Sequence, residues 1–423
     1  MVSPVIYLLN ISQMINVFFV DEHNSSKQNG IGTFRDILLP RLSQYPDINI
    51  TLVSLNSDCE NLKVETYPYG YEYALPFVAN GNWRESGNLI WPLLRTYIAD
   101  NARNLFIFNH SPCAEFIESM KRQFPKSKSI FVIHDQGWCA PLWGSANLLK
   151  RVLNNDTIKG IDESTAQYVR DYCNKEHRIY DAVDKVICLS KSTETILKKI
   201  YHEPTDKLVR IENGYKTIHS GYTKKDKARK QLGIRNDEEL LIFASRPVSH
   251  KGIMPLLYAM QILRKKRPYL KCVLAGMING FSKYWNLGSP IASGLILPGY
   301  QTPEQMREWY SAADVGVLSS YTEQCSYSAL EMMNSGITIV SSDGNGLCDM
   351  FTNGKDSLVV HIDNVLNPKA YGRKLAQAIE KALELSHEQK MALYKGAKHL
   401  LRDKYSIDVM AKRYHDLIQK IIP

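Results

Sequence analysis

The sequence of 423 residues predicts two α/β domains, each built on a parallel sheet with helical crossovers. Strand-like apolar runs alternate with helix-like stretches nearly from end to end, which is typical of parallel sheets. The chain is long enough for two cores, and 44% of its residues are apolar. We therefore expect a first domain over residues 1–215, a second over 216–405 and a separate helical segment over 406–423.

The net charge of +9 is concentrated in the second half of the chain. Residues 1–215 hold 23 Lys and Arg against 24 Asp and Glu, whereas residues 216–423 hold 29 against 19. A basic second domain favours an anionic ligand, with at most peripheral attraction to anionic lipid. Nucleic acid is a poorer expectation, because the sequence contains no recognised binding motif and no long basic run.

The cysteines and the N-terminal stretch both point to a cytoplasmic protein. The eight cysteines are scattered without a C-x-x-C pair, which is typical of reduced thiols and argues against a structural zinc site. The apolar N-terminal stretch is interrupted by polar residues, and its first lysine is Lys27. A secretory signal carries positive charge before its apolar part, so we interpret this stretch as a strand. No apolar run approaches the ~18 residues of a membrane span.

In the first domain, a glycine turn over Asn29–Phe34 is expected to precede the first helix. A dinucleotide fingerprint would need a third glycine where Arg35 stands, so Gly30 and Gly32 are weak evidence for NAD. The expected strands are Ile6–Asn10, Ile48–Leu55, Leu105–Asn109, Ile130–His134 and Lys185–Ser190, and the expected helices are Arg35–Gln44, Ala114–Phe124 and Lys191–Tyr201.

The polar, basic stretch Asn213–Asp237 is interpreted as the connection between the domains. A second series of strands and helices follows it, and the chain is expected to be helical from Lys369 onward. The expected strands are Leu240–Ser245, Lys271–Ala275, Leu295–Leu297, Val315–Ser319 and Ile337–Ser342, and the expected helices are Ile253–Arg264, Ser326–Gly336 and the final Val409–Ile421.

Two glutamates with seven residues between them, Glu323 and Glu331, mark the candidate site. Glu323 falls in a loop at the carboxyl end of a strand, and Glu331 lies about one turn into the next helix. The amides of Ser326, Tyr327 and Ser328 would form an anion site at that helix N-terminus. Carboxylates on either side of a phosphate site suit a sugar nucleotide. Two solvated glutamates on a surface helix fit the same spacing.

Two cations, Arg246 and Lys251, directly follow the expected strand LLIFAS. Because they lie five positions apart across a loop, both can reach one diphosphate. Fixed cations stabilise the charge that develops when a sugar–diphosphate bond breaks. Alone, they also fit two ordinary loop charges. The adjacent His250 has no role in this interpretation.

The segment from Asp314 through Gly346 resembles the nucleotide-sugar segment of retaining, two-domain glycosyltransferases of the GT-B type in family 4, the glycosyl transferases group 1. The resemblance implies a GT-B architecture, with two Rossmann-like doubly wound domains facing across a cleft. It also implies a C-terminal helix that crosses back to the first domain. The usual glycine-rich centre between the glutamates is replaced by Gln324, Cys325 and Ser326, so the donor sugar is not identified.

The resemblance assigns a role to each candidate residue of the second domain. Arg246 and Lys251 would bind the diphosphate, Glu331 the ribose hydroxyls and Glu323 the sugar hydroxyls. Tyr300 follows a strand where such enzymes bind the base, although a packed tyrosine is the simpler interpretation.

In the first domain, the resemblance places a histidine at His134, close to the reacting sugar, and a glycine-rich loop at Gly32. His134 ends a strand, where a lone histidine is more often structural. His110 is a weaker candidate. The aromatic stretch 138–143 directly follows His134 and is expected to border the acceptor, and a second aromatic stretch covers 66–77.

The sequence therefore predicts a retaining glycosyltransferase that moves a sugar from a nucleotide-diphosphate sugar, with UDP as the default, to a glycan, peptide or lipid-linked acceptor. Metal-independent transfer is expected, because no Asp-x-Asp pair occurs and the two cations can neutralise the leaving group. No other cofactor is expected. The alternatives are a non-catalytic sugar-nucleotide-binding partner of another transferase and a GT-B sugar-nucleotide epimerase.

Overall fold

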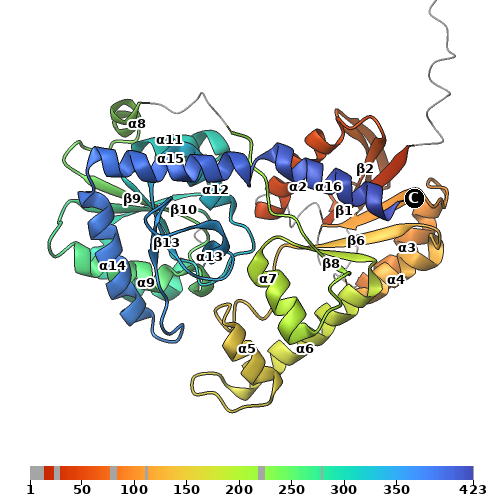
Figure 1. The fold of residues 1–423 in the computed structure, drawn as a ribbon, viewed down its shortest axis with the longest axis horizontal. Helices are drawn as coiled ribbons and strands as arrows, with labels where there is room; N and C mark the ends of the chain where they lie inside the picture. The colour runs from red at the N-terminus through yellow and green to blue at the C-terminus, as the bar shows by residue number, and fades with distance from the viewer. Residues whose placement is uncertain are drawn as a thin grey trace, which may run out of the picture. The chain divides into compact units, whose positions relative to one another are not determined.

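The structure, a computed structural model, describes residues 14–22, 29–76, 83–109, 113–217, 224–277 and 280–422 (Figure 1). The chain divides into two compact units. The first unit comprises Met1–Gln136, Asp171–Gly214 and Ile407–Pro423, and the second comprises Gly137–Arg170 and Tyr215–Ser406.

The observed division differs from the predicted domains at residues 137–170, which we had placed in the first domain. Side chains and carbonyls of this segment bond to the second unit. The indole Nε1 of Trp143 donates to Ser249 Oγ at 2.9 Å, for example. The sequence pattern alone could not show these long-range bonds.

The described part of the first unit contains an eight-stranded sheet with the order β3-β4-β2-β1-β5-β6-β7-β8. Neighbouring strands are parallel except β3 and β4. The strands are β1 (Ile15–Glu22), β2 (Ile48–Ser57), β3 (Lys63–Tyr67), β4 (Gly70–Pro76), β5 (Asn104–Phe108), β6 (Lys128–Ile133), β7 (Lys185–Cys188) and β8 (Leu208–Arg210).

Helices follow most strands of this sheet, as the alternating pattern predicted. They are α2 (Gly30–Leu42), α3 (Trp83–Arg95), α4 (Ala114–Gln123), α6 (Glu163–Ala182), which belongs to this unit from Asp171 onward, α7 (Lys191–Ile196), which continues as the π-helix Leu197–Tyr201, and α16 (Ile407–Ile421). Every residue of β5 is buried. The central strands read as continuous apolar runs because they are covered on both faces.

The first strand and the glycine turn differ from the sequence prediction. The predicted strand Ile6–Asn10 lies outside the described residues, and the first described strand is β1. Helix α2 begins at Gly30, so the two glycines of NGIGTF lie in its first turn and not in a loop before it. The cause is Asn29, whose Oδ1 accepts from the N–H of Ile31 at 2.9 Å and thereby caps the helix.

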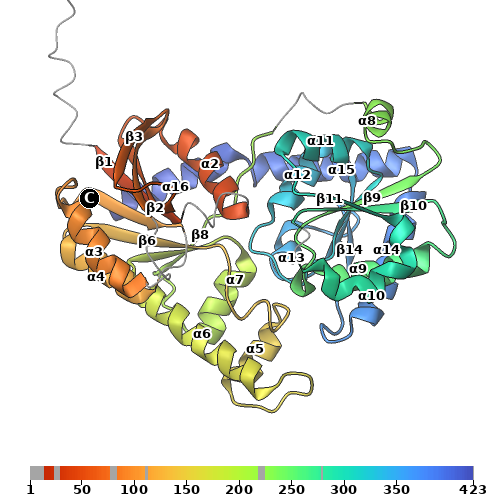
Figure 2. The ribbon, with the colours of Figure 1, turned by 180° about the vertical axis from the view of Figure 1, so that it is seen from behind.

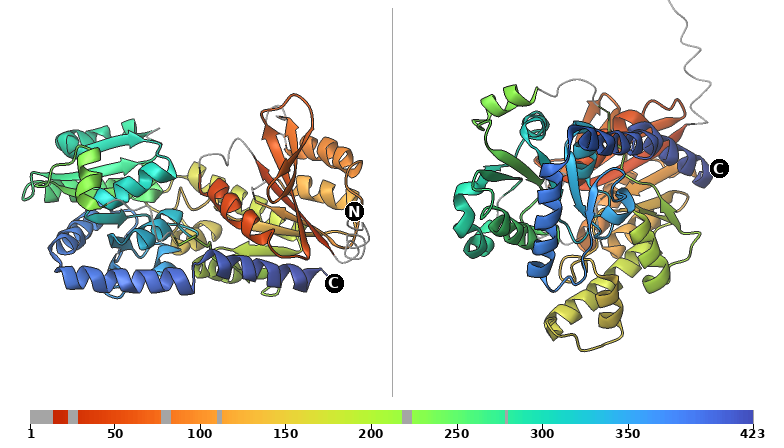
Figure 3. Two further views of the ribbon diagram at one scale, coloured as in Figure 1. Left: turned by 90° about the horizontal axis from the view of Figure 1, so that it is seen from above. Right: turned by 60° about the vertical axis from the view of Figure 1, so that its left-hand side comes forward.

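The aromatic stretch 66–77 forms an edge of the first sheet. Its residues up to Pro76 belong to the antiparallel hairpin of β3 and β4, and Phe77 lies outside the described residues. In Figure 3, the red and orange strands β1 to β4 lie beside one another. Tyr67 stacks on Tyr69 with ring centroids 5.5 Å apart. These aromatic residues are part of the sheet edge.

The described part of the second unit contains a six-stranded parallel sheet with the order β11-β10-β9-β12-β13-β14 (Figure 2). The strands are β9 (Glu239–Ala244), β10 (Leu270–Ala275), β11 (Leu295–Gly299), β12 (Val315–Leu318), β13 (Thr338–Ser342) and β14 (Leu358–Val360). The helices are α5 (Ala146–Leu153), α8 (Lys225–Gln231), α9 (Ile253–Leu263), α10 (Trp285–Gly288), α11 (Pro303–Ala312), α12 (Tyr327–Ser335), α13 (Leu347–Met350), α14 (Pro368–Glu384) and α15 (His387–Asp403).

The core of the second unit lies between this sheet and the packed helices α9 and α14. Leu256, Leu257 and Leu375 are fully buried there. The stretch interpreted as a connection contains helix α8, whose Arg229 is buried and donates to the carbonyl of Ala312 at 3.1 Å. The expected connection from Tyr215 onward therefore belongs to the second unit.

The last helix, α16, packs on helix α2 of the first unit. Tyr414 is fully buried, with its ring centroid 6.0 Å from that of Phe34. His415 Nε2 lies 3.0 Å from both carboxylate oxygens of Asp47. Among the described residues, no helix combines the length and the apolar character that a membrane span needs.

Candidate functional site

The turn that carries Lys251 is fixed by a close backbone approach. Lys251 ends a 3-10 turn, Ser249–Lys251, and Gly252 follows it with φ of +76°. A Cβ on Gly252 would lie 1.9 Å from the carbonyl oxygen of Ser319, at the end of β12. Only glycine allows this approach, which places Lys251 beside the loop that follows β12.

Lys251 forms an ion pair with Glu323. Its Nζ lies 2.8 Å from Oε2 of Glu323, and the exposed fractions of the two side chains are 18% and 14%. The hydroxyl of Ser320 donates to Oε1 of the same carboxylate at 2.8 Å. Removing one partner would leave the other charge largely desolvated, which is costly, so the two side chains fix each other.

A second loop holds the backbone of Glu323. Its N–H donates to the carbonyl of Asn345 at 2.8 Å, and Gly346 packs directly against it. A Cβ on Gly346 would lie 2.1 Å from the carbonyl oxygen of Glu323. The Asn345 side chain in turn donates to the carbonyl of Gly144, in the segment 137–170. Glu323 is therefore held at the carboxyl end of β12 by two contacts, the ion pair with Lys251 and the backbone hydrogen bond to Asn345.

Helix α12 begins directly after this loop and ends at Gly336 in the left-handed conformation, as the sequence predicted. Ser326 is its N-cap, and its side chain accepts from the N–H of Ala329. The Ser328 hydroxyl donates to the carbonyl of Ala244 at 2.6 Å, which fastens the helix start to the end of β9. The first N–H groups of α12, including that of Tyr327, lie at this strand end.

Glu331 lies in the second turn of α12 and is partly buried. Its Oε2 accepts a hydrogen bond of 2.8 Å from the hydroxyl of Tyr310. Burial raises the pKa of Glu331 to about 7, against the opposing effects of Tyr310 and Arg307. A carboxyl of this kind changes its charge near neutral pH, and such groups are concentrated at functional sites.

Arg246 and His250 complete the loop after β9. Arg246 is exposed, and its backbone follows the strand end directly. Burial lowers the pKa of His250 to about 4, aided by the charges of Lys251 and Arg246 and opposed by that of Glu323. All three charged groups therefore lie within electrostatic reach of His250, to which the sequence analysis gave no role.

The structure thus brings Lys251 and Glu323 together, with Arg246 in the same loop as Lys251, and Ser328 ties the start of the helix that carries Glu331 to the end of β9. Tyr300 follows β11, the edge strand of the sheet, and its side chain is 48% exposed. In the described part of the chain, no hydrogen bond or ion pair joins Tyr300 to Arg246, Lys251 or Glu323.

Tyr310 and Asn345, near this group, are not among the residues predicted from the sequence, and Trp143 is predicted only as part of an aromatic stretch. Each reaches the group from a different element, and none stands in a recognisable motif. Trp143 belongs to the aromatic stretch 138–143 that we expected at the acceptor. Its bond to Ser249 places it against the turn that carries Lys251. Trp138 and Leu142 of that stretch are fully buried.

His134 and Gly32 lie in the first unit. His134 directly follows β6, and its Nε2 lies 2.7 Å from Oδ1 of Asn109. Its ring packs edge-on against Phe34, with centroids 4.8 Å apart. Gly32 is buried in the first turn of α2. The weaker candidate His110 lies outside the described residues.

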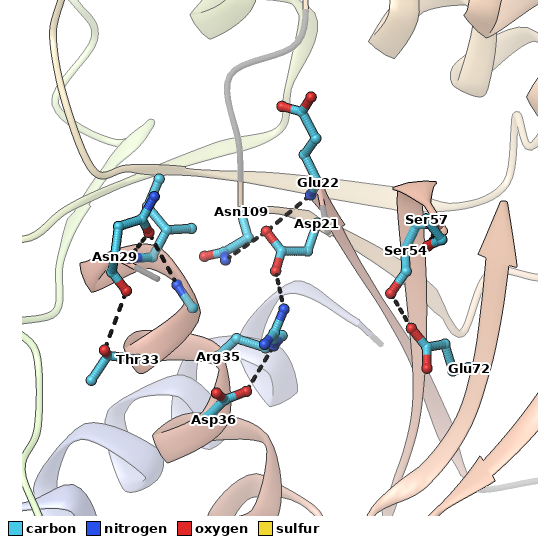
Figure 4. Close-up of polar contacts among 12 residues, drawn as sticks. Asp21, Glu22, Asn29, Thr33, Arg35, Asp36, Ser54, Ser57, Glu72 and Asn109 are labelled. Atoms are coloured by element: carbon cyan, nitrogen blue, oxygen red, sulfur yellow. Dashed lines mark hydrogen bonds and ion pairs between the residues drawn. The ribbon is translucent and has the colours of Figure 1, made fainter. Parts of the chain in front are cut away.

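A charged pair lies behind Asn109 in the first unit (Figure 4). The buried carboxylate of Asp21 accepts from Asn109 Nδ2 at 3.3 Å and from the Arg35 guanidinium at 2.8 Å. Burial alone would lower the pKa of Arg35, but the carboxylates of Asp36 and Asp21 outweigh it and raise the pKa. In the sequence, Arg35 breaks a glycine pattern and begins the expected helix, and neither feature indicates this pair.

Comparison with protein families finds a match to the model described as glycosyl transferases group 1, over residues 224–399. This range contains Arg246, Lys251, Glu323 and Glu331. It begins just before α8 and ends before α16.

Curated relatives are similar over about half of the chain. A lipopolysaccharide 1,2-N-acetylglucosaminetransferase of Salmonella typhimurium is 25% identical over 232 residues, which are 52% of this chain and 59% of the relative. A D-inositol 3-phosphate glycosyltransferase of Pseudarthrobacter chlorophenolicus is 26% identical over 264 residues, 58% of this chain and 62% of the relative. The chain thus spans less than two thirds of the length of either relative.

Solved structures are similar over nearly the whole chain. A sucrose-phosphate synthase from Thermosynechococcus elongatus gives a TM-score of 0.72 at 18% identity, covering 96% of this chain and 99% of the other. The Anabaena protein HepE, in complex with UDP and glucose, gives a TM-score of 0.66 at 16% identity, and the match covers 96% of this chain and 100% of the other. At these identities the likeness shows the fold, which is GT-B with two Rossmann-like units.

Proposed function

From the match of residues 224–399 to the model described as glycosyl transferases group 1, we propose that the chain is a retaining glycosyltransferase of family 4. It transfers a sugar from a nucleotide-diphosphate sugar to a hydroxyl of a glycan, peptide or lipid-linked acceptor. The observation that carries the proposal is the Lys251–Glu323 pair of 2.8 Å at the carboxyl end of the second sheet, beside the N-terminus of α12.

In this proposal, the second unit binds the donor through charges matched to its parts. Arg246 and Lys251 bind the diphosphate, together with the first amides of α12. Glu331 accepts hydrogen bonds from the ribose hydroxyls, and Glu323 from hydroxyls of the sugar. Tyr300 lies at the base. UDP is the proposed nucleotide, supported by the UDP complex of the structurally similar Anabaena protein.

The cations also give the proposed transition-state stabilisation. Negative charge grows on the diphosphate oxygens as the anomeric bond breaks. In this proposal, Arg246 and Lys251 are already in position before the reaction begins. Lys251 is held by Gly252 and Glu323, so little reorganisation is needed. We propose that these two residues make a divalent metal ion unnecessary. By resemblance, we propose roles in the reaction for His134, which directly follows β6, and for Gly32, which lies in the first turn of α2.

A cytoplasmic location is part of the proposal, since the eight cysteines are scattered without a C-x-x-C pair, which is typical of reduced thiols. Sugar nucleotides are anionic ligands, and the basic second half of the chain suits them.

The proposal is tested by combining binding with product analysis in the full chain. A panel of UDP, GDP and ADP sugars is screened by thermal shift in the presence of EDTA, because a ligand of the folded state raises the melting temperature. We expect one diphosphate sugar to stabilise the protein. The stabilising donor is then mixed with sugar, lipid and peptide acceptors, and release of nucleoside diphosphate is measured.

The outcomes separate the three candidate functions. Nucleoside diphosphate released only with an acceptor, with the donor's anomeric configuration kept in the product by NMR, supports retaining transfer. Binding without release, under every acceptor class, would instead support a partner subunit. A changed sugar without any acceptor would support an epimerase. A requirement for Mg²⁺ or Mn²⁺ overturns the metal-independent step alone.

A further inference from the structure

Three neighbouring strands of the first sheet end in polar residues at one edge. In the parallel pairs β1–β5 and β5–β6, Val20 lies opposite Phe108, and Phe108 lies opposite Phe131. Asp21 therefore comes at the end of β1, while Asn109 and His134 directly follow β5 and β6. The carboxyl ends of parallel strands meet at the same edge, so the topology itself gathers these three side chains.

The side chains are linked in series. His134 Nε2 lies 2.7 Å from Asn109 Oδ1, and Asn109 Nδ2 donates to Asp21 Oδ1 at 3.3 Å. Asp21 Oδ2 accepts from the Arg35 guanidinium at 2.8 Å, and Asp21 Oδ1 also accepts from the N–H of Glu22 at 3.0 Å. Figure 4 shows Asp21 between Asn109 and Arg35. Asn109 is 0% exposed and Asp21 is 1% exposed.

This series fixes the position of a proton. Asp21 forms an ion pair with the Arg35 guanidinium, and the carboxylate of an ion pair only accepts hydrogen bonds. It therefore requires the amide nitrogen of Asn109, which turns the amide oxygen toward His134. Because that oxygen is also only an acceptor, Nε2 of His134 must carry the proton. The reversed amide would place oxygen against carboxylate and nitrogen against the ring.

We propose that Asn109, Asp21 and Arg35 are positioning residues that hold His134 in the Nε2–H tautomer and in one ring orientation. The inference rests on the proposed function, in which His134 lies at the reacting sugar. Phe34 restricts the ring plane by its edge-on packing, and it is itself fully buried. The hydrogen-bonding character of His134 toward a sugar hydroxyl is thus set by residues that never touch the substrate.

The tautomer is tested directly by NMR, without any substrate. The full chain is labelled with ¹⁵N-histidine, and long-range ¹H–¹⁵N correlations distinguish a protonated Nε2 from a protonated Nδ1. His134→Ala identifies the signal. We expect Nε2–H in the unsubstituted protein and a mixture of tautomers in Asp21→Asn, because an asparagine at position 21 both donates and accepts. A protonated Nδ1 in the unsubstituted protein would overturn the inference.

The link to activity is tested by a double-mutant cycle. Asp21→Asn and Asn109→Ala break the series at different links, and each is expected to lower kcat by about tenfold or more while the KM for the donor is unchanged, because a wrongly protonated histidine loses its role even in place. In the His134→Ala background, both substitutions are expected to have no further effect on kcat. Equal losses in both backgrounds would show a merely structural role and overturn the inference.

Controls keep these outcomes distinct from unfolding and from a wrong function. Arg41→Gln removes another arginine of α2, whose partner Asp408 is unconnected to His134, and it should change neither the tautomer nor kcat. Thermal unfolding identifies any variant that no longer folds, and Arg35→Lys, which keeps the charge, should retain most of the tautomer preference. If the tautomer responds as expected but no transferase activity is found, the proposed function fails while the proton assignment stands.

Discussion

The carboxyl edges of the two sheets position their polar side chains in different ways. In the second unit, the backbone sets the geometry: Gly252 and Gly346 allow loops to approach within contact distance, and Lys251 then pairs directly with Glu323. In the first unit, side chains from β1, β5 and α2 act in series behind His134. Substitutions that add side-chain volume should therefore disturb the edge of the second unit. The edge of the first unit should instead respond to the exchange of one polar side chain for another.

The largest effect is expected from Gly252→Ala. The new Cβ would meet the Ser319 carbonyl at 1.9 Å in a left-handed conformation, so the backbone must move. We expect a loss of about 3 kcal/mol in the free energy of unfolding of the second unit and loss of donor binding. Denaturant unfolding and calorimetry measure the two effects.

Gly233→Ala is the matched control for this substitution. Gly233 also has a positive φ, of +68°, but its Cβ would meet nothing within 4 Å. It should cost only about 1 kcal/mol and leave donor binding intact. Similar losses in both variants would contradict the view that the approach to Ser319 places Lys251.

An intermediate effect is expected from Glu331→Gln, which should raise the stability of the folded protein and lower its affinity for the donor. Burial raises the pKa of Glu331 from 4.5 to about 7 in the folded protein. Between these values the unfolded chain has released a proton that the folded chain still holds, so this group's contribution to stability falls as the pH rises. Above pH 7 the free-energy cost of burying the ionised carboxylate is fully present. The variant should then be more stable than the unsubstituted protein by on the order of 2 kcal/mol.

Donor binding should change in the other direction. Glutamine accepts ribose hydroxyls less strongly than a carboxylate, so affinity for the donor at pH 8 should fall by about tenfold. Unfolding at pH 4 and pH 8 tests the stability difference, which should vanish at the lower pH. Glu380→Gln, in an exposed pair with Lys266, is the control and should show no such pH dependence. A pH-independent difference for Glu331→Gln would refute the role of its burial.

The smallest effect is expected from Trp143→Phe. It removes the hydrogen bond of 2.9 Å to Ser249 at the turn before Lys251, while most of the ring's packing is kept. A hydrogen bond of this kind contributes about 1 kcal/mol, so the donor KM should rise about fivefold with little change in kcat. Trp285→Phe, at a 48% exposed indole, should leave KM unchanged. A fall in kcat with unchanged KM would place Trp143 in a different role.

Much of the fold and part of the second-unit site could be predicted from the sequence. The period of apolar residues located β9, β12 and α12, and Gly336 marked the end of that helix. Strand-end position then placed Lys251 and Glu323 at one edge. That they form a direct ion pair depends on Gly252 and Gly346, whose contacts join segments far apart in the chain.

The other site residues carry no local signal. Tyr310 lies 21 positions from Glu331, and Asn109 lies 88 positions from Asp21, so neither pair appears in any short motif. Asn29 shows a different limit. An asparagine before two glycines is equally typical of a turn, and only the bond to the N–H of Ile31 shows that it caps a helix.

Binding of a nucleotide-diphosphate sugar to the second unit is tested most directly by calorimetric titration of UDP and UDP-sugars in EDTA. Lys251→Ala is compared with the unsubstituted chain and with Lys266→Ala, which removes a lysine of an exposed ion pair in the same unit. We predict binding to the unsubstituted chain and to Lys266→Ala, and affinity at least about a hundredfold weaker in folded Lys251→Ala, since a charged partner is lost in a largely desolvated site. Equal affinity in all three proteins, or no binding of any nucleotide sugar to the unsubstituted chain, would contradict the account.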